Sequence, residues 1–268
     1  MAISTSNLGA LTNAPKQVTS DYLTDVRTEW QYAFSTSSRS SINLSLYNIS
    51  GGDDADLILY QDVNRNSIVD SGDRSMMDST NSSNADDSVN YQADAGNYIA
   101  VIRRYPSSQG VVEYDLALSA TSPKQPANLL PKEYNLGDIR LGSILNTDPN
   151  RTRTIVRSGL VGNDDTVDTY YFTAVSRGDG TKINVSLTGL SADADVRLIQ
   201  DFNGNRIVDA NEVSIAASST NSGTSNESFS KYLSNYSLSQ YGGAFIQVYQ
   251  YSGNTNYTLN TTLTSTLG

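Results

Sequence analysis

The sequence contains the stretch Asp193-Ala-Asp-Val-Arg-Leu-Ile-Gln200, which leads directly into Asp201-Phe-Asn-Gly-Asn-Arg-Ile-Val-Asp-Ala-Asn-Glu212. In the first part, Val196 and Leu198 alternate with other residues, which is the period-two pattern of a strand with one buried face. The second part carries oxygen-bearing side chains at positions 1, 3, 5, 9 and 12 of a twelve-residue loop. The stretch therefore predicts a strand followed by a tightly curled polar loop.

The same pattern occurs a second time, earlier in the chain. The segment Asp62-Val-Asn-Arg-Asn-Ser-Ile-Val-Asp-Ser-Gly-Asp73 keeps all five oxygen positions and the Ile-Val pair at positions 7 and 8. Flanking segments repeat as well, because Ile42-Asn-Leu-Ser-Leu46 matches Ile183-Asn-Val-Ser-Leu187 and Gly96–Ile102 matches Gly243–Tyr249. This repeat is far longer than the period of a solenoid, so it indicates a duplicated domain.

Short apolar runs with a period of two recur in both copies, for example at Ile42, Leu44 and Leu46. Clusters of Gly, Asn, Asp and Ser separate these runs at turn-like intervals. We expect an all-β protein: two tandem antiparallel β-sandwich domains, jelly-roll-like, with calcium loops and roughly seven to nine strands each. The frequent tyrosines are expected to lie half-buried, with their hydroxyls in water.

The segment Thr121-Ser-Pro-Lys-Gln-Pro-Ala-Asn-Leu-Leu-Pro131 lies between the copies and contains three prolines. Proline disfavours helix and central strand and promotes extended chain. We therefore expect a first sandwich over residues 1–120, a proline-rich linker over 121–131 and a second sandwich over 132–268.

Composition narrows the function classes. The chain has 28 acidic and 18 basic residues, a net charge of −10, and no cysteine or histidine. Its acidity disfavours nucleic acid and anionic membranes and suits multivalent cations. Without thiols or imidazoles, most zinc sites and familiar nucleophile–base pairs are excluded, so we expect no enzyme. No stretch is long enough for a transmembrane helix, and the sequence does not choose an export route.

The two polar loops have the spacing of calcium ligands, because Ca²⁺ prefers six to eight oxygens and a curled loop turns alternate side chains inward. They depart from the EF-hand pattern at position 6, where Ser67 and Arg206 replace glycine, and their strand-like flanks argue against a helix-loop-helix. The alternative is a polar hairpin turn that binds no ion. Val69 and Val208, at position 8, are expected to anchor the loops on the core.

We expect Ca²⁺ to be the bound cofactor in both loops. Because Glu212 reaches further than Asp73 does, the second loop is expected to bind calcium more tightly. The expected ligands in the first loop are Asp62, Asn64, Asn66, the carbonyl of Ile68, Asp70 and Asp73, and those in the second are Asp201, Asn203, Asn205, the carbonyl of Ile207, Asp209 and Glu212.

Other acidic residues have two readings each. The pairs Asp54/Asp56 and Asp193/Asp195 suit additional ligands or acid–base work, and equally suit turn chemistry at the start of a strand. Two residues apart on a strand, the members of each pair would face the same side. Asp168 and the neighbouring Asp164-Asp165 suit approach to a cation or capping of a loop, and we expect them to be solvated acid.

Several strings of the second copy resemble the bacterial pre-peptidase C-terminal domain, in the tandem form of cyanobacterial extracellular proteins. They are Leu187–Leu198, Ser218–Gly223, Ile246–Leu259 and the opening Asp168-Thr-Tyr-Tyr-Phe172. The first copy departs at Trp30-Gln-Tyr-Ala-Phe34, which lacks the opening Asp. The resemblance implies a compact β-sandwich, often stabilised by calcium, that accompanies secreted proteases and other exported enzymes and is not itself catalytic.

We therefore expect a non-catalytic, secreted, calcium-binding protein with a structural or assembly role at the cell surface or in the extracellular matrix. Its partners would be further copies of itself, or extracellular polysaccharide or protein, with no nucleic acid and no membrane insertion. The alternatives are an adhesin or binding module that uses exposed tyrosines around Tyr249-Gln-Tyr251, or accessory domains of a secreted protease.

Overall fold

The computed structural model describes residues 3–108, 110–145, 147–213, 216–240 and 242–267. The chain divides into two compact units, Met1–Glu133 and Tyr134–Gly268, which are described separately below. Over the described ranges, no helix has the length and apolar character needed to cross a membrane. The expected all-β class is confirmed, since both units consist of packed sheets.

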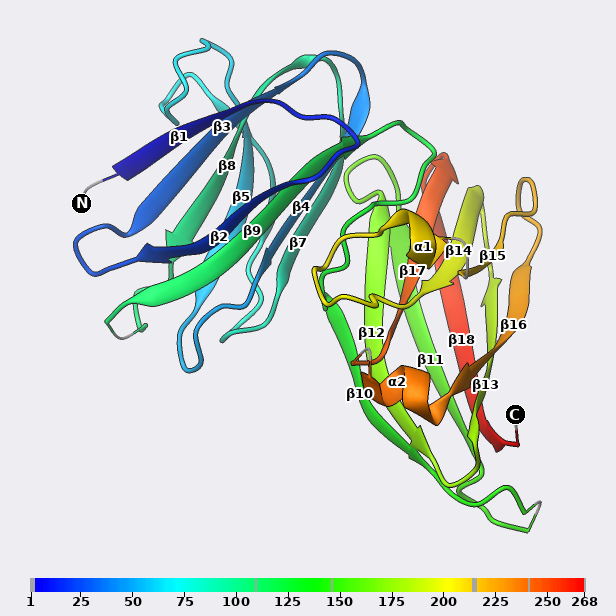
Figure 1. Ribbon diagram of the computed structural model, residues 1–268. Helices are drawn as coiled ribbons and strands as arrows, with labels where there is room; N and C mark the ends of the chain where they lie inside the picture. The colour runs from blue at the N-terminus through cyan, green and yellow to red at the C-terminus, as the bar shows by residue number, and fades with distance from the viewer. Residues whose placement is uncertain (1–2, 109, 146, 214–215, 241, 268) are drawn as a thin grey trace. The chain divides into compact units, whose positions relative to one another are not determined.

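The first unit contains a five-stranded sheet in the order β1-β3-β8-β5-β6 and a four-stranded sheet in the order β2-β9-β4-β7 (Figure 1). The strands are β1 (Ile3–Ala10), β2 (Lys16–Leu23), β3 (Glu29–Thr36), β4 (Ser40–Tyr47), β5 (Ala55–Gln61), β6 (Arg74–Ser79), β7 (Asp87–Ala93), β8 (Gly96–Arg104) and β9 (Val112–Thr121).

The second unit repeats this arrangement, with sheets in the orders β10-β12-β17-β14-β15 and β11-β18-β13-β16. Two short helices are added, one on each side of β15 and β16 in the chain. The elements are β10 (Tyr134–Leu141), β11 (Thr152–Val161), β12 (Val167–Ser176), β13 (Gly180–Thr188), β14 (Asp193–Ile199), α1 (Ala210–Val213), β15 (Ala217–Ser219), β16 (Glu227–Ser234), α2 (Asn235–Gln240), β17 (Ala244–Ser252) and β18 (Thr255–Thr266).

Strand for strand, the two units have the same topology, so β5 corresponds to β14 and β7 to β16. Nearly all neighbouring strands are antiparallel, as expected. The exception is the opening strand of each unit, because β1 pairs parallel with β3 and β10 pairs parallel with β12. A parallel edge strand is easily missed in a sequence, since its alternation does not reveal its direction.

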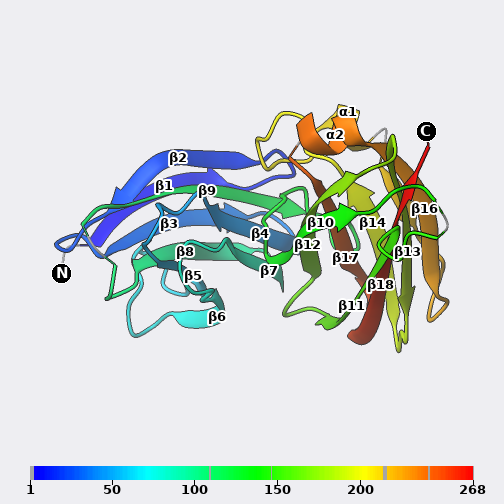
Figure 2. The same cartoon turned by 90° about the horizontal axis from the view of Figure 1, so that it is seen from below.

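Figure 2 shows the strands of each unit from below. An apolar core lies between the two sheets of each unit. In the first unit, the predicted row Ile42, Leu44 and Leu46 of β4 is at most 1% exposed. Leu44 lies opposite Val89 on one side and Leu118 on the other, and both are fully buried. Period-two alternation therefore located this core face correctly.

The proline-rich segment after β9 makes defined contacts with the first unit. The side-chain amide of Asn128 donates to the backbone carbonyl of Asn13, and the hydroxyl of Ser119 donates to the side-chain oxygen of Asn128. Further along, the backbone N–H of Lys132 donates to Asp86 at 2.7 Å. The boundary between the compact units falls after this segment, between Glu133 and Tyr134.

A pair of tyrosines occupies the same place in both cores, contrary to the expectation of half-buried rings with hydrated hydroxyls. The hydroxyls of Tyr32 and Tyr114 lie 2.7 Å apart, as do those of Tyr170 and Tyr257. All four rings are at most 2% exposed. Burial leaves a hydroxyl dependent on protein partners, which these pairs supply.

We expect Tyr257→Phe to lower the free energy of unfolding of the second unit by about 1–3 kcal/mol, because the Tyr257 hydroxyl donates to the buried carboxylate of Asp168. Urea unfolding followed by circular dichroism measures the loss. Tyr232→Phe is the control, since Tyr232 is 40% exposed and its change should fall within about 0.5 kcal/mol. Equal losses in the two variants would contradict the assignment.

Candidate metal centres

Each candidate loop follows a core strand of its unit. Asp62 comes directly after β5, and Asp201 comes shortly after β14. Both position-1 carboxylates are buried, and both turn back to accept backbone N–H groups of the curled loop. Asp62 accepts from Asn66 at 3.2 Å and from Ser67 at 3.0 Å. Asp201 accepts from Gly204 at 2.8 Å and from Arg206 at 2.9 Å.

Positions 3 and 5 of both loops repeat the same local hydrogen bonds. The side-chain oxygen of each Asn accepts the backbone N–H two residues further on, as in an Asx turn. In the first loop Asn64 accepts from Asn66 at 3.1 Å and Asn66 from Ile68 at 2.9 Å. In the second loop Asn203 accepts from Asn205 at 3.0 Å and Asn205 from Ile207 at 2.8 Å.

The backbone at position 6 is left-handed in both loops, although neither residue is glycine. The φ angle is 64° at Ser67 and 63° at Arg206, and position 4 is also left-handed, at Arg65 and Gly204. In sequence, the missing glycine is a departure from the calcium pattern. The departure lies in the residue type only, because the chain takes the turn that glycine normally provides there.

We expect Ser67→Gly to raise the free energy of unfolding of the first unit by about 1 kcal/mol, because a left-handed backbone is strained for a residue with a Cβ atom. Thermal denaturation measures the gain. The control is Ser71→Gly in the same loop, at a position outside the left-handed region, which should destabilise the unit by about 0.5–1 kcal/mol. A gain in both variants would contradict the backbone argument.

The carboxylate at position 12 closes each loop. In the first loop Asp73 accepts the N–H of Val63 at 2.9 Å and that of Asp70 at 3.0 Å. In the second loop the fully buried Glu212 accepts the N–H of Phe202 at 2.6 Å and that of Asp209 at 2.9 Å. The bond from the Asp209 N–H to Glu212 supplies one half of a capping box at the start of α1.

The helix α1 at this end was not expected, and it follows from that capping pair. The strand-like reading of Ser214–Ala217 lies partly outside the described residues, and β15 begins at Ala217. On the N-terminal side the expected strand flanks are present, since β5 and β14 precede the two loops. Neither loop is flanked by helices on both sides, so the expectation against a helix-loop-helix holds.

Position 9 is the centre of each loop's hydrogen bonding. In the first loop one oxygen of Asp70 accepts the side-chain amides of Asn64 at 2.8 Å and Asn66 at 2.7 Å. In the second loop Asp209 accepts those of Asn203 at 2.7 Å and Asn205 at 3.1 Å. The N–H of Gly72 and the two amides hold the pKa of the Asp70 carboxyl below its usual range.

These amide groups determine what a cation would have to displace. The three carboxylates of each loop, all of them described, are not gathered within 4.8 Å of one another. An amide nitrogen cannot ligate Ca²⁺, so Asn64 and Asn66 would have to rotate and present their oxygens instead. The cation-free loop is thus closed by hydrogen bonds, and calcium would exchange those bonds for oxygen coordination.

The apolar residues at positions 7 and 8 behave differently from each other. Ile68 is 46% exposed, so its side chain does not anchor the loop, and this position contributes to the closed loop through its backbone. Val69 packs against the outer-face cluster of Ala33, Ile58, Ile99 and Val101, and its N–H donates to Gln31 at 2.9 Å. The expected anchoring of the first loop by Val69 is confirmed, while Val208 of the second loop is half-buried.

Two interpretations of other residues were wrong. Asp168 is not solvated acid, because it is 2% exposed, and burial raises its pKa to about 6. Burial and the charge of Asp168 together raise the pKa of Asp165 to about 8. Tyr249, proposed as part of an exposed binding surface, is 6% exposed, whereas Tyr251 is 42% exposed. The partners of these residues lie on distant strands, so sequence spacing did not reveal their burial.

Comparison with known proteins gives similarity in fold only. No protein-family model matches the chain, and no curated protein matches it. One similar solved structure is the pre-peptidase C-terminal domain of a collagenase from Bacillus anthracis, with 16% identity over 45% of this chain and 98% of that chain and a TM-score of 0.32. A pre-peptidase C-terminal domain is therefore among the structures that this chain resembles.

Two further structures show likeness at a similar level. The periplasmic inhibitor of g-type lysozyme PliG from Aeromonas hydrophila has 12% identity, over 45% of this chain and 100% of that chain, with a TM-score of 0.30. The tandem CBM22-1–CBM22-2 domain of Xyn10C from Paenibacillus barcinonensis has 10% identity, over 87% of this chain and 82% of that chain, with a TM-score of 0.24. With such low scores, we draw no function from these likenesses.

Proposed function

We propose that this chain is a non-catalytic, calcium-binding protein of two tandem β-sandwiches with a structural or assembly role outside the cell. One observation carries the proposal: the same twelve-residue loop recurs after corresponding strands of both units, with the same hydrogen bonds at positions 3, 5, 9 and 12. Calcium coordination would account for all five oxygen-bearing positions that the two copies share.

The net charge of −10 supports a role with cations, and the absence of histidine and cysteine supports a role without catalysis. In each loop, calcium would bind the oxygens of positions 1, 3, 5, 7, 9 and 12. It would thereby tie the end of one sheet strand to the start of the next, and folding would be coupled to binding.

Isothermal titration of calcium into the full chain tests this proposal. Asp62→Asn should remove the first loop's binding event and leave the second, and Asp201→Asn should do the reverse. The control is Asp25→Asn, which removes one exposed acid outside the loops and should leave both events unchanged. Unaltered titrations in both loop variants would contradict the proposal.

The same variants compare the affinities of the two loops. The second loop is expected to bind calcium more tightly, because Glu212 is longer than Asp73 and reaches bidentate coordination more readily. We expect Asp62→Asn, which leaves the second loop, to titrate with a lower dissociation constant than Asp201→Asn does. Equal constants, or the reverse order, would contradict the expectation.

The assembly role has its own test. Light scattering on the full chain in calcium-containing buffer should show species larger than the monomer, and a strict monomer at all concentrations would contradict self-association. The second candidate function, an adhesin or accessory binding module, is favoured by the 42% exposed Tyr251 at the end of β17. A glycan array that binds wild type and not Tyr251→Ala would favour that candidate.

A further inference from the structure

Three carboxylates lie near one another in the first unit, at the end of β5 away from the calcium loop. Their oxygens, all of them described, are not gathered within 4.8 Å of one another, so a shared ion would require these side chains to turn toward it. Asp54 and Asp56 flank Ala55 where β5 begins, and Asp87 is the first residue of β7. Ser79, on β6, pairs with Leu57 on β5, and its hydroxyl donates to Asp87 at 2.6 Å. This register brings Asp87 beside the start of β5, about 20 Å along the strand from the loop.

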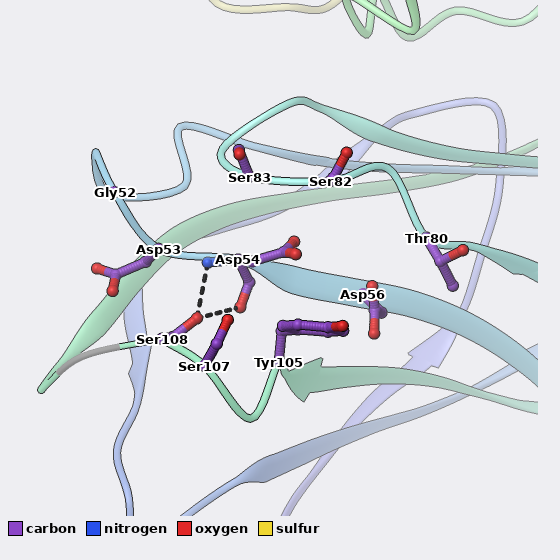
Figure 3. Close-up of a pocket in the computed structure, with 10 residues that line it drawn as sticks. All are labelled: Gly52, Asp53, Asp54, Asp56, Thr80, Ser82, Ser83, Tyr105, Ser107 and Ser108. Carbon is purple, nitrogen blue, oxygen red and sulfur yellow. Dashed lines mark hydrogen bonds between the residues drawn. The ribbon is translucent and has the colours of Figure 1, made fainter.

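Asp54 and Asp56, at the start of β5, line a hollow of about 640 Å³ (Figure 3), and Asp87 lies behind this lining. The strand start, the β6–β7 connection and the segment after β8 form its walls. Oxygen-bearing side chains predominate, since Thr80, Ser82 and Ser83 lie across from Asp54 and Asp56. The hollow thus offers carboxylate and hydroxyl oxygens, with space for water molecules.

Two of the carboxylate oxygens are buried and lack a hydrogen-bond partner among the described residues. Asp87 is fully buried, and while one of its oxygens accepts from Ser79 and from the N–H of Asn81, the other accepts from nothing. One oxygen of Asp54 is also buried and has no hydrogen-bond partner among the described residues. Buried polar atoms are nearly always satisfied, so an unpartnered buried oxygen indicates a missing ligand.

The local electrostatics also favour a positive ligand. Burial, together with the charges of Asp56 and Asp54, raises the pKa of Asp87 to about 7. Burial and the charge of Asp54 raise the pKa of Asp56. Arg103 opposes this rise, but its guanidinium is already paired with Glu29 at 3.0 Å. Protonation would remove one charge and leave an O–H group without an acceptor. A bound cation would satisfy the charges and the unpartnered oxygens together.

The second unit repeats the arrangement at the start of β14 with Asp193, Asp195 and Glu227. Glu227 is fully buried and accepts the N–H of Asn221 at 2.9 Å, as Asp87 accepts that of Asn81. Asp193 has a buried oxygen with no partner in the described part of the chain. Burial, together with the charges of Asp193 and Glu227, raises the pKa of Asp195 to about 7.

We propose that each unit holds a second cation site, distinct from its loop: Asp54, Asp56 and Asp87 in the first unit, and Asp193, Asp195 and Glu227 in the second. The donors are oxygens only, which select a hard divalent cation. Three carboxylates from two strand starts, with hydroxyls and water nearby, match the flexible coordination of Ca²⁺ better than the strict octahedron of Mg²⁺. Each ion would fasten the strand start to the neighbouring sheet.

The test counts bound calcium by equilibrium dialysis with radioactive calcium, using the full chain with both loops disabled by Asp62→Asn and Asp201→Asn. In this background Asp87→Asn should lower the number of calcium ions bound per chain by one, and Asp195→Asn should remove another. The matched control is Asp78→Asn, which removes an exposed acid on β6 close to Asp56 and should leave the number unchanged.

Melting temperatures separate binding from folding. In chelator, Asp87→Asn should melt no lower than its parent, because it removes a buried charge; in calcium, it should gain less stability than its parent does. Should Asp87→Asn fail to fold, Asp54→Asn, which is only half-buried, should lose the same ion. The proposal is overturned if calcium counts are equal in the variants and the control, or if Asp87→Asn raises the melting temperature equally with and without calcium.

These outcomes are independent of the loop proposal. If the loops bind no calcium, Asp62→Asn and Asp201→Asn will leave the count of the wild-type chain unchanged, while Asp87→Asn still lowers it. If only the loops bind calcium, the background variant will bind none.

Discussion

Removing calcium with a chelator is expected to lower the melting temperature of the full chain by on the order of 10 °C. A ligand that binds only the folded state stabilises it by RT ln(1 + [L]/Kd), about 2.7 kcal/mol per site at a calcium concentration of 100 times Kd. For units of this size, 1 kcal/mol corresponds to several degrees. Differential scanning calorimetry with and without calcium measures the effect.

The same treatment should expose the loops to proteases. Without the ion, the segments Asp62–Asp73 and Asp201–Glu212 keep only their internal hydrogen bonds, so we expect faster cleavage within them. Asp62→Asn combined with Asp201→Asn should remove the loops' share of the calcium-induced gain in melting temperature. An identical melting temperature in calcium and in chelator would refute the stabilising role.

Asn66→Asp is expected to have opposite effects with and without calcium. In chelator it should destabilise the first unit, because Asp70 loses the amide donor at 2.7 Å and gains a like charge beside it. In calcium the variant supplies a charged ligand at position 5, which should tighten binding about tenfold, or roughly 1.4 kcal/mol. Chemical denaturation in the two buffers measures both effects.

The control for this reversal is Ser71→Asp, which adds a negative charge at position 10 of the same loop, outside the ligand positions. It should change calcium affinity much less than Asn66→Asp does, since a general charge effect at an exposed site is screened. If Asn66→Asp destabilises the unit equally in both buffers, the loop is a hydrogen-bonded turn and not a calcium site.

Much of the fold could be predicted from sequence because local pattern and tertiary burial agree. The rows Ile42/Leu44/Leu46 and Ile183/Val185/Leu187 are core faces, as their alternation indicates. The sequence repeat also corresponds to a repeat in structure, since both units have the same strand order. The parallel pairing of β1 and β10 was missed, because strand direction depends on where the chain returns.

Side-chain environment was harder to predict than strand position. Tyr114 and Tyr257 are buried because their hydroxyls meet Tyr32 and Tyr170, which are more than 80 residues away. Asp168 is buried for the same reason, through Tyr257. Such pairs form only after the sheets pack, so a local pattern cannot distinguish them from ordinary half-exposed strand residues.

The candidate sites were likewise predictable only where their residues are close together in the sequence. All oxygen positions of the two loops are contiguous in sequence, so their spacing alone located them. The pairs Asp54/Asp56 and Asp193/Asp195 were noticed, but their third members were missed because β7 and β16 begin some thirty residues later. A signal was present, because Asp87 and Glu227 are acids at corresponding places in the two copies. Each is followed by Ser, and each accepts the backbone N–H of an Asn six residues earlier.

The most direct measurement of the central claim is anomalous X-ray diffraction from crystals of the full chain grown in millimolar calcium. We predict one peak in each twelve-residue loop, with the carboxylates of Asp62 and Asp201 and the carbonyls of Ile68 and Ile207 about 2.3–2.6 Å from the ion. The Asn side chains at positions 3 and 5 should be turned so that their oxygens face it. The claim would be contradicted by loops that show no peak and are still closed by hydrogen bonds from the Asn side-chain amides to Asp70 and Asp209.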